Sequence, residues 1–153
     1  MSWVKAPAAL LLAGLVGACA GLPSQPIPAT NSEAGVALKG YDPVAYFTEG
    51  KPVEGSAQYG YRWNGVDYHF ASAENRDRFA ADPVTYAPQY GGYCAFAIAN
   101  SQIADIDPTD WAVVGHKLYL NNNGVAQSLW SLDKPGNIAA GDRHWADVPK
   151  TQP

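Results

Sequence analysis

Cysteine and methionine are scarce in this sequence, which has two of the first and one of the second in 153 residues. Cys19 lies beside an apolar N-terminal stretch, so Cys94 is the single thiol of the remaining chain and no internal disulfide is expected. A closed soft-metal site usually takes four ligands, often from close pairs such as C-x-x-C, and no such pair occurs. Met1 is the sole thioether, which argues against a copper carrier that uses methionine ligands.

Clustered basic residues and catalytic motifs are also missing. The chain has 10 Lys and Arg against 14 Asp and Glu, and its basic residues are scattered singly. Nucleic acid is therefore not an expected partner, because its phosphates require a basic stripe. No G-x-S-x-G, P-loop or H-E-x-x-H motif occurs. The carboxylates of Asp105, Asp107 and Asp110 surround a proline in what reads as a loop, so we expect no enzyme.

The longest apolar run, Ala8–Val16, is shorter than the ~20 residues that a membrane-spanning helix needs. It leads into Val16-Gly17-Ala18-Cys19, which resembles a bacterial lipobox. This pattern predicts a signal peptide over residues 1–18, a lipid on Cys19, and a place in the periplasm on the outer membrane. The small residues around Cys19 also fit ordinary secretion, and an uncleaved anchor is a third alternative. All three export the protein.

The rest of the chain has room for one domain. Residues 19–35 contain three prolines and no apolar periodicity, so we expect a Pro-rich extended tether. The globular domain is predicted over residues 36–148, with residues 149–153 as a frayed tail.

The clearest local signal is a hairpin, because Asn64-Gly65 joins two alternating runs over Tyr59–Phe70. On one side the facing pairs are mostly aromatic: Tyr59 with Phe70, Tyr61 with Tyr68, and Trp63 with Val66. On the polar side Arg62 faces Asp67 and His69 faces Gly60. A helix over Ala73–Ala80 should follow, capped by Ser72.

Two repeats bear on the fold class. Asp-Pro-Val-x-Tyr occurs at 42–46 and 82–86, and Asp followed by Pro predicts a helix start at each place. Fifty positions after the hairpin, Trp111–Trp130 aligns Gly115 with Gly65 and Leu129 with Phe79, which is either chance or a second hairpin-and-helix unit. Pro135 marks a last helix. The expected class is α+β with a small antiparallel sheet, with two degenerate ββα units sharing one core as an option.

At this point the residues resemble a known family. Tyr68-His69 with Ser72, Phe79, Asp82-Pro83 and Tyr86, preceded by Gly40-Tyr41-Asp42-Pro43-Val44, is similar to the YHS domain over Gly40–Ala95. The resemblance implies a role in metal handling, with copper first and zinc or iron as alternatives. It also implies cysteines after Asp-Pro-Val and after the hairpin, where this chain has Ala45, Ala71 and Asn75.

Metal binding would therefore depend on the remaining soft ligands, Cys94, His69 and His116. One thiol with one or two imidazoles suits copper or zinc, in a weak or transient site. Cys94 could instead be a small buried side chain or form a disulfide between chains. Both histidines could simply be solvated.

A metal-free binding module is the competing hypothesis. The aromatic face of Tyr61, Trp63 and Tyr68 could take a small ligand or an envelope protein partner, if helices do not cover it.

Overall fold

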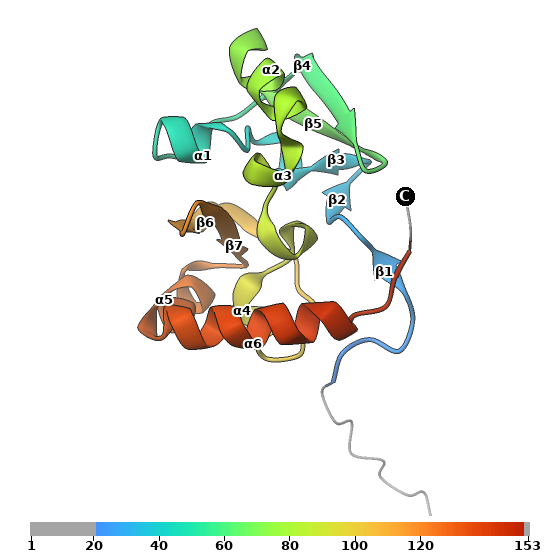
Figure 1. The fold of residues 1–153 in the computed structure, drawn as a ribbon, viewed down its shortest axis with the longest axis vertical. Helices are drawn as coiled ribbons and strands as arrows, with labels where there is room; N and C mark the ends of the chain where they lie inside the picture. Colours follow the sequence, from blue (N-terminus) through green and yellow to red (C-terminus); the bar gives the residue numbers. More distant parts are fainter. Residues whose placement is uncertain (1–20, 152–153) are drawn as a thin grey trace, which may run out of the picture.

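Two β-hairpins, each followed by a pair of helices, organise the computed structural model, which describes residues 21–151 (Figure 1). The first unit contains β4 (Ser56–Trp63), β5 (Val66–Phe70), α2 (Ala73–Ala81) and α3 (Pro83–Tyr86). The second contains β6 (Asp107–Val114), β7 (Lys117–Asn121), α5 (Gly124–Leu132) and α6 (Lys134–Asp147). The expected α+β class is confirmed.

Each hairpin is preceded by a short 3-10 helix and a short α-helix. These are η1 (Leu38–Gly40) with α1 (Ala45–Thr48), and η2 (Gln89–Gly92) with α4 (Ala95–Ala99). Short strands complete the fold: β1 (Ile27–Pro28), β2 (Ser32–Glu33), β3 (Val36–Ala37) and β8 (Lys150–Thr151). The strands form a sheet in the order β2-β3-β5-β4, the β6-β7 hairpin, and a parallel β1-β8 pair.

The register of the first hairpin is confirmed near the turn and differs at the far end. Trp63 pairs with Val66, Tyr61 with Tyr68, Arg62 with Asp67, and Gly60 with His69. Phe70 pairs with Ser56 and not with Tyr59, because a bulge lies between Ser56 and Gly60. The predicted Tyr59–Phe70 pair is therefore wrong.

The two units are related by a shift of 51 residues, so the predicted shift of fifty is wrong by one. The pairs Ser56–Phe70 and Gly60–His69 correspond to Asp107–Asn121 and Trp111–Leu120, with the same irregularity between them. The same shift relates the first residues of η1 and η2, of α2 and α5, and of α3 and α6.

The turns explain the error of one residue. Both turns need two residues with positive φ. Asn64 and Gly65 supply φ of 48° and 77°, whereas Gly115 and His116 supply 57° and 59°. Glycine thus takes the second turn position in one hairpin and the first in the other. An alignment that superposes Gly65 and Gly115 is therefore displaced by one residue from the correspondence that the strand registers give.

The helix starts follow the predicted caps in part. Ser72 accepts a hydrogen bond from Asn75 N at the start of α2, and Asp82 accepts from Thr85 N ahead of Pro83 in α3. Asp42 differs, because α1 begins at Ala45 and Val44 is its N-cap. The carboxylate of Asp42 still accepts from the first N–H groups of that turn.

Apolar side chains gather in two clusters. The larger one takes residues from both units, including Tyr68, Phe70 and Phe79 of the first and Leu118 and Leu120 of the second. A smaller cluster lies between β7 and the helices of the second unit and contains Tyr90, Tyr93, Ala95, Ile98, Tyr119 and Trp130. Strand β7 is therefore buried on both faces. The two units share the larger cluster as a common core, and the second unit packs around the smaller cluster as well.

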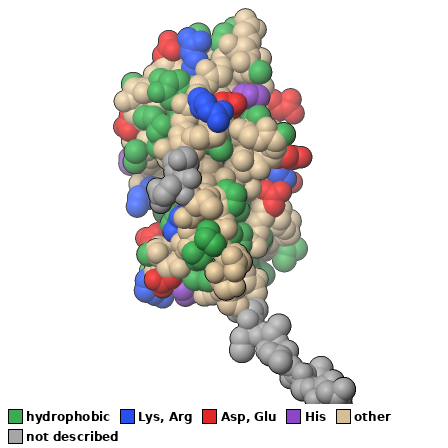
Figure 2. All heavy atoms as spheres, turned by 90° about the vertical axis from the view of Figure 1, so that its right-hand side faces the viewer, with side chains coloured by type: hydrophobic (Ala, Val, Ile, Leu, Met, Phe, Trp, Pro, Cys, Tyr) green, Lys and Arg blue, Asp and Glu red, His purple; other side chains and the backbone are tan. Residues whose placement is uncertain are grey.

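Part of the predicted tether is paired with the domain. Ile27 N donates to Pro149 O, Asn31 N donates to Gly91 O, and β1 pairs with β8, which includes part of the predicted frayed tail. Figure 2 shows the face with β1 and β8, where basic side chains are separated by acidic and neutral surface. Within residues 21–151, no helix is long and apolar enough to span a membrane.

Candidate functional site

A buried carboxylate occupies the place where the YHS resemblance would put cysteines. Asp42 is fully buried, and its Oδ1 accepts hydrogen bonds from Val44 N at 2.8 Å and Ala45 N at 3.3 Å. Its Oδ2 accepts from Ala71 N at 2.9 Å and from Asn75 Nδ2 at 2.7 Å. Three of these four donors belong to the positions of the expected cysteines. One carboxylate thus ties α1, the end of β5 and α2 together.

In the second unit an amide side chain makes the corresponding connections. Asn121 is fully buried, and its Oδ1 accepts from Phe96 N at 2.9 Å and from the Cys94 thiol at 3.6 Å. Its Nδ2 donates to Gln127 Oε1 at 2.7 Å, and Gln127 Nε2 donates in turn to Trp111 O. Strand β7, α4 and α5 are joined by this chain of hydrogen bonds.

Cys94 is free and buried, and it lies at the edge of a pocket of about 330 Å³. We call this the thiol pocket; Cys94, Phe96, Ala97, Asn100, Asn122 and Ala126 are among the residues that line it. A shift of 51 carries Ala45, Ala71 and Asn75 onto Phe96, Asn122 and Ala126. The single thiol of the domain therefore lies beside the counterparts of the residues that donate to Asp42, whereas the shift carries Asp42 itself onto Tyr93.

The structure does not assemble the three predicted metal ligands. His69 is half-buried and lines a different pocket with Glu33, Lys39 and Gly40, and His116 is exposed in the turn between β6 and β7. Among residues 21–151, no three His, Cys, Asp or Glu side chains are grouped so that they could hold a metal ion. The described residues thus do not fit the predicted Cys94–His69–His116 site.

The predicted aromatic face is mostly covered by α2. Tyr68 is buried, with its ring 4.7 Å from that of Phe79. Tyr61 and Trp63 are partly exposed and meet the same phenylalanine edge-on, at 6.1 and 5.9 Å between ring centroids. Most of this face therefore belongs to the core.

Two residues of that face nevertheless reach a pocket of about 270 Å³ at the edge of the sheet. Its lining combines both units and both ends of the chain. We call it the aromatic pocket; Thr30, Trp63, Tyr68, Pro88, Trp145 and Lys150 are among its lining residues. Sequence reasoning missed Trp145 and Lys150, because they lie about 80 positions away from Trp63 and Tyr68 and only the fold brings them together.

Lys150 is held in place within the aromatic pocket. Its Nζ donates to Trp145 O at 2.6 Å and to Val148 O at 2.8 Å, and it lies 4.4 Å from the centre of the Trp145 ring. Burial lowers the pKa of Lys150 below its ordinary value, and the charge of Asp147 opposes this shift. An ammonium group has three protons to donate, so the two carbonyls leave one for a further acceptor.

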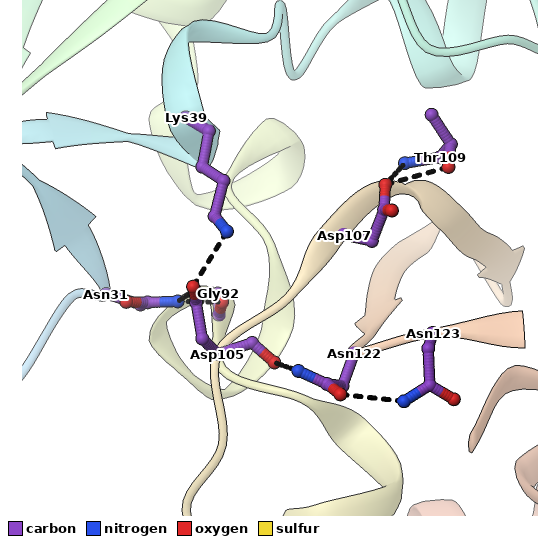
Figure 3. A network of polar contacts seen from close by, with 8 residues as sticks. All are labelled: Asn31, Lys39, Gly92, Asp105, Asp107, Thr109, Asn122 and Asn123. Carbon is purple, nitrogen blue, oxygen red and sulfur yellow. Dashed lines mark hydrogen bonds and ion pairs between the residues drawn. The ribbon is translucent and has the colours of Figure 1, made fainter. Parts of the chain in front are cut away.

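A polar network holds the N-terminal segment against the linker between the units (Figure 3). Asp105 accepts from Asn31 Nδ2 at 2.9 Å and pairs with Lys39 Nζ at 2.7 Å, while Asn122 Nδ2 donates to the carbonyl of Asp105. Burial would raise the pKa of Asp105, but the hydrogen bonds from Lys39 and Asn31 outweigh it and the pKa is lowered. The predicted loop carboxylate is thus a structural one.

The fold defines an α+β protein built from two related hairpin-and-helix units. Residues 44–90 match the family model of the YHS domain, and this segment runs from the N-cap of α1 through the first unit into η2. The resemblance inferred from the sequence is confirmed there, and the second unit lies outside the match. No curated protein and no solved structure matches the chain.

Proposed function

We propose that this protein is a non-catalytic binding module of the bacterial envelope, which takes a small aromatic carboxylate in the aromatic pocket. The observation that carries the proposal is the pocket itself, because Trp63, Tyr68 and Trp145 line it together with an ammonium group that is held over the Trp145 ring. Ligand pockets combine apolar and aromatic walls with a few convergent polar groups, and this one does so. The rings suit a flat apolar body, and Lys150 suits an anionic end.

The location in the envelope is part of the proposal and is supported by the sequence alone. Cys19 and the preceding signal-like residues lie outside the described residues. A lipid on Cys19 would hold the module on the membrane, with the outer membrane as the expected one.

The test uses two matched lysine substitutions. Indole-3-acetate and neutral indole are titrated into the full chain, with isothermal titration calorimetry and ligand-detected NMR as readouts. We expect indole-3-acetate to bind more tightly than indole, and Lys150→Met to remove that preference. Lys117→Met changes an exposed lysine at the start of β7 and should leave it intact. Equal binding of both probes, or equal behaviour of both variants, contradicts the proposal; thermal melts check that each variant folds.

Weak transition-metal binding stays the competing prediction. The YHS family favours it, whereas the separation of Cys94 and His69 into different pockets does not. Titration with copper(I) and with zinc, repeated on Cys94→Ala, decides between the two. Stoichiometric uptake that disappears with the thiol would restore the metal site. We expect no such uptake.

A further inference from the structure

Helix α5 carries an exposed apolar stripe. Val125, Leu129 and Leu132 are 70%, 44% and 82% exposed, and their spacing of four and three residues places them on one side of the helix. The other side carries Trp130, which is fully buried. The nine residues of α5 include no charged side chain. This stripe has no role in the core or in either pocket described above.

The first unit shows that the fold does not require such a stripe. The shift of 51 residues places Glu74 and Arg78 of α2 at the positions of Val125 and Leu129. These two form an ion pair at 2.6 Å on an exposed helix face. A charged and an apolar outer face are therefore both compatible with the same unit. The fold alone therefore does not explain why the exposed face of α5 is apolar.

The position of α5 relative to the N-terminal segment suggests its partner. Figure 1 shows α4, α5 and α6 at one end of the molecule, and the described chain begins beside this end. Ile27 is fixed by its pairing with β8, and only eight Cα-to-Cα steps, with seven residues in between, lead from Cys19 to it. Eight extended steps span at most about 26–29 Å. A lipid on Cys19 would hold this end of the domain close to the bilayer.

We propose that the stripe of Val125, Leu129 and Leu132 rests in the surface of the lipid bilayer to which Cys19 is anchored. The inference rests on the lipid anchor of the proposed function and adds to it the orientation of the domain relative to the membrane. An uncharged helix face enters the boundary between headgroups and acyl chains without desolvating a charge. Docking there leaves the hairpin and α2 of the first unit directed away from the membrane.

A second copy of the chain is a weaker partner for this surface. A stable dimer needs about 800 Å² from each subunit, which usually means 20–30 residues a side. Three side chains on a nine-residue helix provide only a small part of that. A bilayer has no such threshold, because the tether already holds the helix beside it.

The experiment uses the full chain, produced in a bacterium that processes lipoproteins and then floated on vesicles of phosphatidylethanolamine and phosphatidylglycerol. A nitroxide label is placed at Val125→Cys or, as the matched control, at Glu74→Cys, each combined with Cys94→Ala. We expect the label at 125 to be more accessible to oxygen and several-fold less accessible to a water-soluble nickel chelate than the label at 74. Adding Leu129→Gln and Leu132→Gln should return position 125 to the behaviour of position 74.

The outcomes separate the anchor from the docking. A chain that fails to float overturns the lipid anchor and the docking with it. A chain that floats with equal accessibility at 125 and 74 overturns the docking alone. Protection from nickel without a gain in oxygen accessibility indicates contact with protein, and also overturns it. Circular dichroism of each variant confirms that α5 is still folded.

Discussion

The two halves of this molecule have the same order of elements and differ in the side chains that they carry on equivalent faces. In the first unit, the strand face that carries Asp67 and His69 is polar. In the second unit, the corresponding residues are Leu118 and Leu120, which are buried in the shared core. The helices differ in the same way, since α2 exposes an ion pair and α5 exposes apolar side chains. The same arrangement of strands and helices can thus carry either polar or apolar side chains at equivalent positions, according to the surroundings of each unit.

The buried polar centres show the same principle. Asp42 receives four hydrogen bonds in the first unit, all from nitrogen donors. Asn121 both accepts and donates, and it also receives the weak donor of Cys94. A carboxylate only accepts hydrogen bonds and therefore fits a site that offers donors alone. An amide both donates and accepts and therefore fits a site that offers both donors and acceptors.

The largest expected effect comes from removing these centres. Asp42→Ala leaves four N–H groups without their acceptor, and each buried unsatisfied donor costs about 1–3 kcal/mol. Because Ala71 is partly open to water, we expect a loss of about 3–5 kcal/mol in the free energy of unfolding. Asn121→Ala should cost less, about 2–3 kcal/mol, since one of its donors is a weak thiol. Urea unfolding curves measure both.

The control for this comparison is Asp77→Ala, which changes an exposed acidic residue on α2. Its effect should stay within about 0.5 kcal/mol. The ranking would be contradicted if Asn121→Ala destabilised the protein as much as Asp42→Ala does.

A smaller effect is expected at the two hairpin turns. His116 adopts φ of 59°, a conformation that costs residues other than glycine roughly 1–2 kcal/mol. His116→Gly should therefore stabilise the second hairpin by about 0.5–1 kcal/mol after the greater chain entropy of glycine is counted. Gly65→His makes the reverse exchange in the first hairpin and should destabilise it by a similar amount. Thermal melts measure both, and shifts of the same sign would contradict the assigned turn positions.

These turns also show what the sequence could and could not reveal. Asn64-Gly65 fixes one hairpin and its register, because few other dipeptides supply two positive φ angles so readily. The second turn is less informative, since His116 is an unusual residue for its position. The bulge after Ser56 has no local signal.

The site was harder to predict than the hairpin. The partners of Asp42 lie up to 33 positions away from it, and the lining of the aromatic pocket joins residues from both ends of the chain. Pairing of this kind is decided by packing and not by local pattern. The correspondence between the surroundings of Cys94 and those of Asp42 follows only from the shift of 51, which the registers of the two hairpins establish.

The smallest expected effect concerns the link between the units, where Lys39 of η1 meets Asp105 of the linker. The lowered pKa of Asp105 means that the unfolded chain binds its proton more readily than the folded chain does. Its stabilising contribution is therefore complete above the ordinary pKa of 3.8 and is lost as the pH falls through the folded value. Its side chain is 55% exposed, so the contribution is about 0.2–1 kcal/mol.

Asp110 provides a control of opposite sign close by. Burial and the charge of Asp107 raise its pKa, so its charged form is disfavoured in the folded protein. Urea unfolding at pH 7 and pH 3 should show that Asp105→Asn reduces the loss of stability in acid, whereas Asp110→Asn increases it slightly. Lys39→Met should act like Asp105→Asn, because it removes a main cause of the lowered pKa. Equal acid sensitivity in all these variants and the parent would mean that this ion pair does not couple the two units.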